Sequence, residues 1–325
     1  MRLPLILVVA AACGGPAKPP PAVPLPNDKP AQPPVAAAEP PKGAEDGAKP
    51  EAAPPRPTGP IEIKIAAPQT TVKVVSDGKG KKTPLRYTTK SGAKQAVEIA
   101  MDFSGKQDTD ESVVPTIVLS GEAETRSIDK DGGAEYMLTI TSTDARPVAN
   151  SSVPIDQFKT VLGSLAGLTI GGKRGANGAA GDVTMRIEHP PDHGADALEL
   201  IRFTFPAFPV LPTQAIGVGA RWQSTTTSKL ADKLDVTQVT EYELVAHQGS
   251  TWKIKGTSVI SGKDQEVETA KISAISGQGT SETTIADGAL YPTHKATTET
   301  MFKASDASDK SSQFVLKLGG TFTPH

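Results

Sequence analysis

Apolar and polar side chains alternate along much of the chain beyond residue 60. Ile61, Ile63 and Ile65 alternate with Glu62 and Lys64 at the start of this region. Successive side chains of a β-strand point to opposite faces, so a period of two predicts a strand with one buried face. The same period recurs in further segments, whose predicted inward residues are Val97, Ile99, Met101 and Phe103; Tyr136, Leu138 and Ile140; Val183, Met185 and Ile187; Ile201, Phe203 and Phe205; and Phe314, Leu316, Leu318 and Phe322.

Turn-forming residues separate several of these alternating segments. Asp131-Gly132 lies between two of them, and residues 247–250 (His-Gln-Gly-Ser) join two others. Both sequences favour tight hairpin turns. Serine and threonine fill many positions that we assign to the outward face, as the surface of a β-sheet allows. We therefore expect a meander of long antiparallel strands with few crossovers.

One segment has a helical period instead. Pro154 suits the first position of a helix, and Asp156 suits the positive end of the helix dipole. Gly167 and the glycines after it end the pattern. The sequence therefore predicts one amphipathic helix over about residues 154–167, packed across the sheet. Its apolar positions are Ile155, Phe158, Val161, Leu162 and Leu165.

The N-terminus has the pattern of a signal peptide over residues 1–12. Arg2 is followed by an uncharged, mainly apolar run from Leu3 to Ala12. A helix of that length spans about 15 Å, half of a bilayer core of roughly 30 Å. The run is therefore expected to direct export and to be removed, and not to span a membrane.

The end of this run, Ala10-Ala11-Ala12-Cys13-Gly14, resembles the lipobox of bacterial lipoproteins, and Cys13 is the only cysteine. The resemblance implies that Cys13 becomes the mature N-terminus and carries a diacylglycerol thioether and an amide-linked acyl chain. It also implies a lipid-anchored protein of the cell envelope, and Gly14 in place of Asp favours the outer membrane. Ala10 departs from the Leu, Val or Ile preferred there. The alternative is an ordinary secretory signal with an incidental cysteine.

Residues 13–60, which follow the signal peptide, are predicted to form a disordered tether. They consist mainly of Pro, Ala, Gly, Lys and Glu and hold more than half of the 29 prolines. Large apolar side chains are nearly absent, so burial cannot offset the entropy lost on ordering. A spacer between an anchor and a folded domain at residues 61–325 is the expected role.

Two segments of this domain resemble recurrent segments of uncharacterised bacterial lipoproteins. The first is Phe208-Pro209-Val210-Leu211-Pro212 with residues 216–222, and the second is residues 279–292, which end in Leu290-Tyr291-Pro292. This resemblance carries no assigned activity. The expected architecture is mainly β, a curved antiparallel sheet with one amphipathic helix. It is loosely similar to the half-barrels that carry lipoproteins across the periplasm.

Composition excludes several function classes. The net charge is -2 with both signs interspersed, and aromatic residues make up only 4%, so we expect no nucleic-acid partner. A single cysteine rules out stabilising disulfides within the chain and any site built from several thiolates. Because aromatic residues are few, the core must be mainly aliphatic.

Three motifs resemble ligand sites but lack required residues. Residues 167–173 match the start of a phosphate loop, yet Arg174 stands where Ser or Thr should bind magnesium, and a flexible glycine-rich loop is the better interpretation. Asp129-Lys130-Asp131 begins like a calcium loop without its later ligands, which favours a hairpin. Glu188, His189, Asp192 and His193 could form a loop chelate, although the intervening prolines favour a solvated turn.

The sequence accordingly predicts no catalytic residue, cofactor or metal site. No Gly-x-Ser-x-Gly elbow is present, and Trp222 and Trp252 are better explained as core residues than as a binding face. Three functions stay open. The domain is a structural or protein-binding module of the envelope, a binding or carrier protein for lipid or another apolar ligand on the concave face of its sheet, or an enzyme without a recognisable motif.

Overall fold

The structure is a computed structural model that describes residues 59–190, 194–204, 207–230, 233–305 and 310–325. The predicted signal peptide, Cys13 and almost all of the predicted tether lie outside these residues. The described part contains two helices, α2 (Ile155–Gly163) and α3 (Gly194–Thr204). The strands are β1 (Ile61–Ile65), β2 (Gln69–Ser76), β3 (Lys79–Thr83), β4 (Lys94–Gln107), β5 (Asp110–Val113), β6 (Thr116–Ile128), β7 (Ala134–Arg146), β8 (Thr169–Arg174), β9 (Ala180–Ile187), β10 (Ile216–Val218), β11 (Arg221–Leu230), β12 (Leu234–Gln248), β13 (Thr251–Ser261), β14 (Gln265–Val267), β15 (Ala270–Ala286), β16 (Thr293–Ser305) and β17 (Ser311–Pro324).

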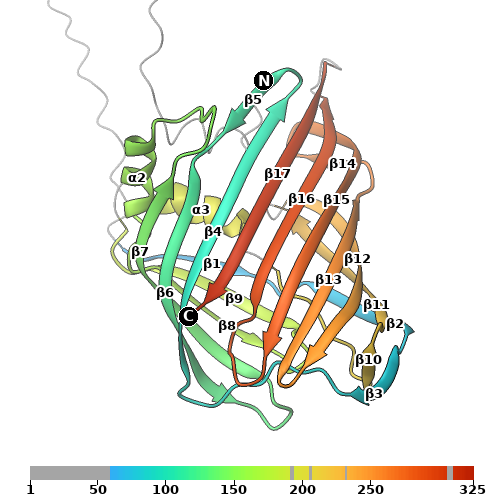
Figure 1. Cartoon of the computed structure of the whole chain (residues 1–325). Coiled ribbons are helices and arrows are strands. Elements are labelled where there is room, and N and C mark those ends of the chain that lie inside the picture. Colours follow the sequence, from blue (N-terminus) through green and yellow to red (C-terminus); the bar gives the residue numbers. More distant parts are fainter. Residues whose placement is uncertain (1–58, 191–193, 205–206, 231–232, 306–309) are drawn as a thin grey trace, which may run out of the picture. The chain divides into compact units, whose positions relative to one another are not determined.

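The predicted antiparallel architecture is confirmed. One 15-stranded sheet has the order β1-β9-β8-β7-β6-β4-β17-β16-β15-β13-β12-β11-β2, with β5 added to β4 and β14 added to β15. The sheet consists of two meanders, β4 to β9 and β11 to β17, which join where β17 pairs with β4 (Figure 1). The small strands β3 and β10 pair separately.

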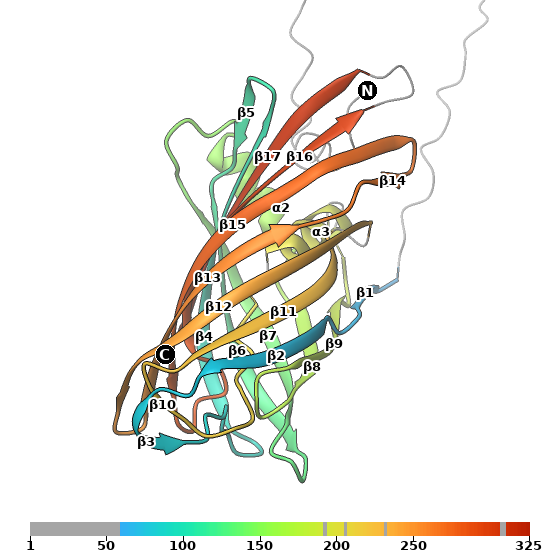
Figure 2. The ribbon, with the colours of Figure 1, turned by 90° about the vertical axis from the view of Figure 1, so that its right-hand side faces the viewer.

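The two edges of the sheet belong to neighbouring strands in the chain. β1 pairs with β9 and β2 pairs with β11, and only residues 66–68 separate β1 from β2. Figure 2 shows this segment in blue, running beside both meanders. No ladder of hydrogen bonds joins β1 to β2, so the sheet is curved and open.

Bulges help to produce this curvature. The register of β6 and β7 shifts between Ser120 and Gly121, and that of β12 and β13 shifts between Leu244 and Ala246. A bulge bends a strand and increases its local twist. Gly121 is required at its bulge, because a Cβ there would lie 2.3 Å from the carbonyl oxygen of Thr139.

The period of two places the predicted inward residues in the core. Ile99 and Met101 of β4, Leu138 and Ile140 of β7 and Met185 of β9 are all buried. The predictions for β1 and β17 are confirmed in the same way. Both predicted hairpins are also present, because Asp131-Gly132 lies between β6 and β7 and Gly249 lies between β12 and β13.

The predicted helix is confirmed as α2, although its α-helical part ends at Gly163. A tighter, 3₁₀-type turn follows, in which the N–H groups of Ser164 and Leu165 donate to the carbonyl oxygens three residues earlier. Gly167 ends the turn with a φ of 84°, which favours glycine. Phe158, Val161 and Leu162 of α2 are buried against the sheet.

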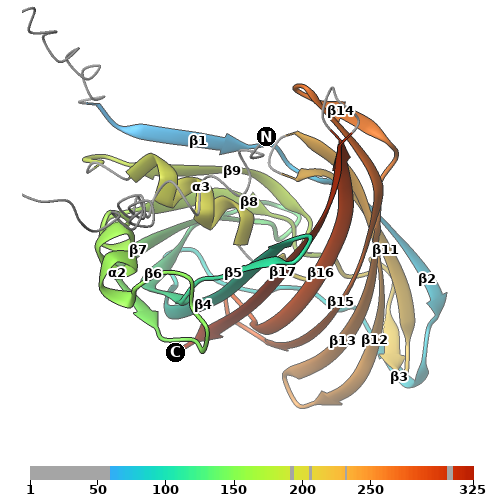
Figure 3. The same ribbon diagram turned by 90° about the horizontal axis from the view of Figure 1, so that it is seen from above.

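A second helix, α3, corrects the prediction of a strand through Ile201 and Phe203; Phe205 lies outside the described residues. Ala197, Leu198 and Ile201 are buried at helical spacing, and this spacing outweighs the weaker alternation. Seen from above, α3 lies within the curve of the sheet and α2 lies beside β7 (Figure 3). Both helices contribute to the largest apolar cluster, which the strands of the first meander complete.

The core position of Leu138 generates a stability prediction. Its side chain is 0% exposed in that cluster, so Leu138→Ala is expected to lower the free energy of unfolding by about 2–5 kcal/mol. Val259 is 61% exposed, so Val259→Ala should change it by less than about 0.5 kcal/mol. Urea denaturation followed by tryptophan fluorescence measures both. Equal effects in the two variants would contradict this assignment of core and surface.

Candidate functional site

A row of small hydroxyl side chains crosses the concave face of the sheet. Ser224 of β11 lies opposite Thr240 of β12, which lies opposite Ser258 of β13. The row continues through Gly279 of β15 and Thr298 of β16. Thr240 and Ser258 are buried, so these side chains point inward. They are exceptions to the predicted outward placement of serine and threonine, which holds for exposed residues such as Thr257 and Thr293.

The next row on the same face is also small at its centre. Ser281 of β15, Ala296 of β16 and Gly320 of β17 lie directly opposite one another. Large apolar side chains resume at both ends of the strands. One cluster surrounds Trp222 and Tyr242, and another surrounds Phe302 and Phe314. The two rows therefore leave a band between apolar clusters where little side-chain volume projects from the sheet.

A cavity of about 220 Å³ lies over this band. Its floor is formed by the two rows, apart from Gly279, together with Gln238, Tyr242 and His294. Ala207, Phe208 and Val210 line it from the other side. We call residues 207–211, which follow α3 in the chain, the cover segment. A concave site beneath a short segment is thus built from residues that are far apart in the sequence.

Hydrogen bonds hold the cover segment in place. The Trp222 indole N–H donates to the carbonyl oxygen of Val210 at 3.0 Å, and the Tyr87 hydroxyl donates to that of Pro209 at 2.9 Å. The Leu211 N–H donates to the carbonyl oxygen of Asn177 at 2.7 Å. Burial raises the pKa of the Tyr87 hydroxyl, which keeps it protonated as a donor.

The hydroxyl groups of the floor bond mainly to one another. Thr240 Oγ1 and Ser258 Oγ are 2.9 Å apart, and Gln238 Nε2 donates to both. Burial raises the pKa of Tyr242 to about 12, so its hydroxyl stays neutral. The floor is therefore uncharged and largely satisfied, which suits contact with an apolar or weakly polar molecule.

His294 is a buried titratable group of the cavity. It is 1% exposed, its Nδ1 lies 2.8 Å from Thr283 Oγ1, and its Nε2 has no hydrogen-bond partner. Phe208 of the cover segment meets its ring edge to face, with centroids 5.4 Å apart. Burial lowers the pKa of His294 to about 4, so the imidazole is neutral at physiological pH.

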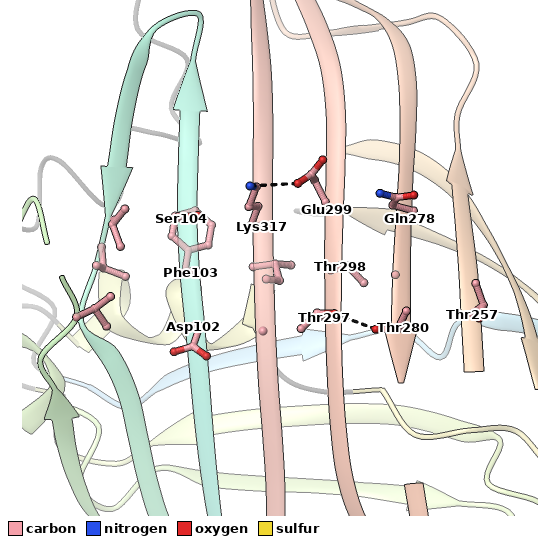
Figure 4. Close-up of a pocket in the computed structure, with 16 residues that line it drawn as sticks. Asp102, Phe103, Ser104, Thr257, Gln278, Thr280, Thr297, Thr298, Glu299 and Lys317 are labelled. Atoms are coloured by element: carbon pink, nitrogen blue, oxygen red, sulfur yellow. Dashed lines mark hydrogen bonds and ion pairs between the residues drawn. The ribbon is translucent and has the colours of Figure 1, made fainter. Parts of the chain in front are cut away.

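A larger and more open groove, of about 590 Å³, lies over β4, β17, β16 and β15 (Figure 4). Lys317 and Glu299 form an ion pair of 3.2 Å in it, and Thr280 and Thr297 share a hydrogen bond of 3.1 Å. Asp102 accepts a hydrogen bond from the Thr116 hydroxyl at 2.5 Å. Because this groove is more open and carries charged side chains, whereas the floor of the concave cavity is uncharged, we regard the cavity as the stronger candidate for a small apolar ligand.

The calcium-like segment forms the predicted hairpin turn. Asp129 Oδ1 accepts hydrogen bonds from the N–H groups of Asp131 and Gly133, at 2.9 and 2.8 Å. Residues 169–173 of the phosphate-loop match lie in strand β8, which ends at Arg174, so the match is not the loop between a strand and a helix that a phosphate loop requires. The predicted glycine-rich loop is shorter than expected, because Gly172 and Gly181 lie within β8 and β9.

The possible loop chelate is described only in part. Glu188 forms an ion pair with Arg186 at 2.7 Å, and His189 is exposed. Asp192 and His193 lie outside the described residues. Within the described ranges, no group of three or more His, Cys, Asp or Glu side chains could hold a metal ion.

Both tryptophans lie in the core, as predicted. Trp222 stacks on Tyr242 with centroids 5.5 Å apart, and Trp252 stacks on His247 at 3.5 Å.

Sequence reasoning missed Phe208 and His294 as cavity residues. The alternation of His294, Ala296, Thr298 and Phe302 in β16 was the available signal, since it places them on one face.

The comparisons with known proteins agree with the resemblance to uncharacterised proteins. A family model described as a family of unknown function (DUF6263) matches residues 204–286, about a quarter of the chain. The matched region begins at the end of α3 and extends through β15, so it includes the cover segment and part of the cavity floor. The search of curated proteins found no match. Neither of the two helices in the described ranges has the length and hydropathy needed to span a membrane.

The buried imidazole predicts a pH dependence of stability. Because the pKa of His294 falls from 6.5 to about 4 on folding, the unfolded chain binds the proton more tightly. The stability that depends on a neutral His294 is fully present above pH 6.5, and it is lost as the pH falls from 6.5 towards 4. Between pH 7.5 and pH 5 the free energy of unfolding of the wild type should fall by about 2 kcal/mol more than that of His294→Gln. Urea midpoints across that range measure the difference, and parallel curves would refute the prediction.

Proposed function

We propose that this chain is a lipid-anchored envelope protein that binds a small, predominantly apolar ligand in the cavity on the concave face of its sheet. The observation that carries the proposal is the band of small side chains between two apolar clusters. Interiors of proteins are close-packed, so neighbouring strands from β11 to β17 that supply Ser, Thr, Ala and Gly at core positions leave space that a ligand can fill.

The chemistry of the cavity supports a ligand with an apolar body. Phe208, Ala296 and Leu318 provide apolar contact, while the hydroxyls of Thr240 and Ser258 bond to each other. A volume of about 220 Å³ is below the roughly 300–1,000 Å³ of pockets for drug-sized ligands. A single short acyl chain or a molecule of comparable size therefore fits better than a lipid with several chains.

Filling the cavity is the direct test. Thr298→Leu adds apolar volume on the inward face of β16 and is expected to weaken binding of octanol at least tenfold. Thr293 is exposed on the outward face of the same strand, so Thr293→Leu is the matched control and should leave binding unchanged. Isothermal titration calorimetry measures both affinities. Native mass spectrometry of the protein isolated from cells provides an independent readout, through a bound mass that Thr298→Leu removes.

Two results would contradict ligand binding. One is a clean apoprotein mass combined with no measurable affinity for any apolar probe. The other is equal weakening by Thr298→Leu and Thr293→Leu, since this would place the effect outside the cavity.

The anchor has its own test at Cys13. Its thiol is the only one in the chain and lies in the lipobox-like segment, so Cys13→Ala should abolish acylation and membrane retention. Mass analysis of the N-terminal peptide and fractionation of membranes measure the two effects. Cys13→Ser should behave in the same way, because the hydroxyl does not form the thioether. Retention of the alanine variant on membranes would refute the anchor.

The groove on the outward side of β4 and β17 supports a second candidate, a protein-binding module. Val113 and Val148 line this groove beside the ion pair of Lys317 and Glu299. A photo-crosslinking residue at position 148 should capture an envelope protein if this face is an interface. Absence of any crosslinked product in intact cells would count against this candidate and would leave ligand binding untouched.

A further inference from the structure

Arg174 is a buried cation at the end of β8. Its side chain belongs to a residue that is 6% exposed, although arginine is rarely buried without a partner. Three of the four tyrosines of the protein surround this position. The guanidinium carbon lies 4.6 Å from the ring centroid of Tyr87 and 5.3 Å from that of Tyr291, and Tyr136 packs edge to face on Tyr291.

The hydrogen-bonding capacity of this cluster is only partly used. Nη2 of Arg174 donates to the carbonyl oxygen of Leu290. Nε and Nη1 of Arg174 are buried without hydrogen-bond partners, and the Tyr291 hydroxyl, which is buried as well, has only the hydroxyl of Tyr136 beside it. All three groups can donate a hydrogen bond, and burial raises the pKa of Tyr291, which keeps its proton in place. Apart from the Leu290 carbonyl oxygen, the acceptors in the cluster are the tyrosine hydroxyls, and neither Nε nor Nη1 of Arg174 bonds to one of them.

The charge of Arg174 is likewise unbalanced. No carboxylate forms an ion pair with Arg174 among the residues that the structure describes. Burial of a charge without a counter-ion is costly, and the faces of two tyrosine rings offset only part of that cost. The missing acceptor is therefore best supplied by an anion, because charge-assisted hydrogen bonds are the strongest available to a guanidinium.

The cluster is connected to the concave cavity by a short chain of ring contacts. Phe208 lines the cavity and packs on Tyr291, with centroids 5.7 Å apart. Tyr291 in turn packs on the guanidinium of Arg174. Tyr87, on the other side of the guanidinium, donates to Pro209 in the cover segment. The ring of Tyr291 alone thus separates the guanidinium of Arg174 from Phe208 in the lining of the cavity, and the cover segment lies beside this cluster.

We infer that Arg174 and the Tyr291 hydroxyl bind the anionic headgroup, a carboxylate or a phosphate, of the ligand that occupies the concave cavity. This inference rests on the proposed ligand binding and names the chemical class of the ligand, a single-chain anionic amphiphile. The headgroup supplies the acceptors that Nε and Nη1 of Arg174 lack and also accepts a hydrogen bond from the Tyr291 hydroxyl, and the chain lies over the small residues of the floor. Because Phe208 lies between the cavity and Tyr291, this binding mode requires its ring to rotate away from Tyr291.

Isothermal titration calorimetry of the full chain at pH 7.5 with octanoate, octyl phosphate, octanol and acetate tests this inference. Octanoate or octyl phosphate should bind at least tenfold more tightly than octanol, which has the same chain without the charge. Acetate should bind at least tenfold more weakly than octanoate, because it lacks the chain. Octanoate and octyl phosphate together distinguish which anion is preferred.

Variants then assign the preference to Arg174. Arg174→Gln should reduce the ratio of octanoate to octanol affinity to about one, and Arg174→Lys should retain part of it. Arg221→Gln is the control, since Arg221 is an exposed arginine paired with Glu241 on the outward face of β11. Tyr291→Phe removes only the hydroxyl and should lower octanoate affinity several-fold with little effect on octanol.

A readout in the wild-type protein covers the case in which Arg174→Gln does not fold. The ¹⁵Nε resonance of Arg174 should shift on addition of octanoate and stay unchanged with octanol. If octanol binds as tightly as octanoate and the resonance does not respond, an ordered water fills the cluster and the inference is overturned, while ligand binding stands. If neither amphiphile binds, the proposed function fails. If acetate binds as tightly as octanoate, the anion site is separate from the cavity and the inference is wrong.

Discussion

The pairing of β17 with β4 is the constraint on which the concave face depends. An uninterrupted ladder runs from Phe314 opposite Gln107 to Pro324 opposite Val97 and joins the last strand of the chain to the first strand of the opposite meander. A sheet register fixes which side chains share a face, because a shift of one residue would turn every side chain over. This ladder therefore places Leu318 and Gly320 on the same side of the sheet as the helices. It thereby determines which side chains of β17 line the cavity.

Much of the fold follows from sequence patterns that act locally. The alternation in β1, β4, β7, β9 and β17, the glycines at the hairpins and the helical spacing of α2 each report a physical requirement over a few residues. The helix α3 was misassigned because Ile201 satisfies both periods, and only contacts with distant strands decide between them. Its i,i+3 pair of Glu199 and Arg202 and the buried Ala197 and Leu198 were the helical signals.

The candidate site was less predictable, since its parts are joined only by tertiary structure. Ser224, Thr240 and Ser258 have the composition of a solvated surface, yet the curve of the sheet and the cover segment place them inside. Arg174 first stood out as the residue that breaks a phosphate-loop motif. Its burial among tyrosines from three distant segments has no local signature, because Tyr87, Tyr136 and Tyr291 are brought together by the sheet.

The segment that forms both sheet edges has a consequence for the order of assembly. Ile61 faces Ile187, and Gln69 faces Thr227, so β1 and β2 find partners only after well over a hundred further residues exist. Contacts at such separation form late, since closing a long loop costs entropy before any pairing repays it. The strands β1 and β2 leave the ribosome early, yet they are thus among the last strands to join the sheet. Until then β9 and β11 present open edges to other chains, and a nascent molecule gains from a chaperone that shields them.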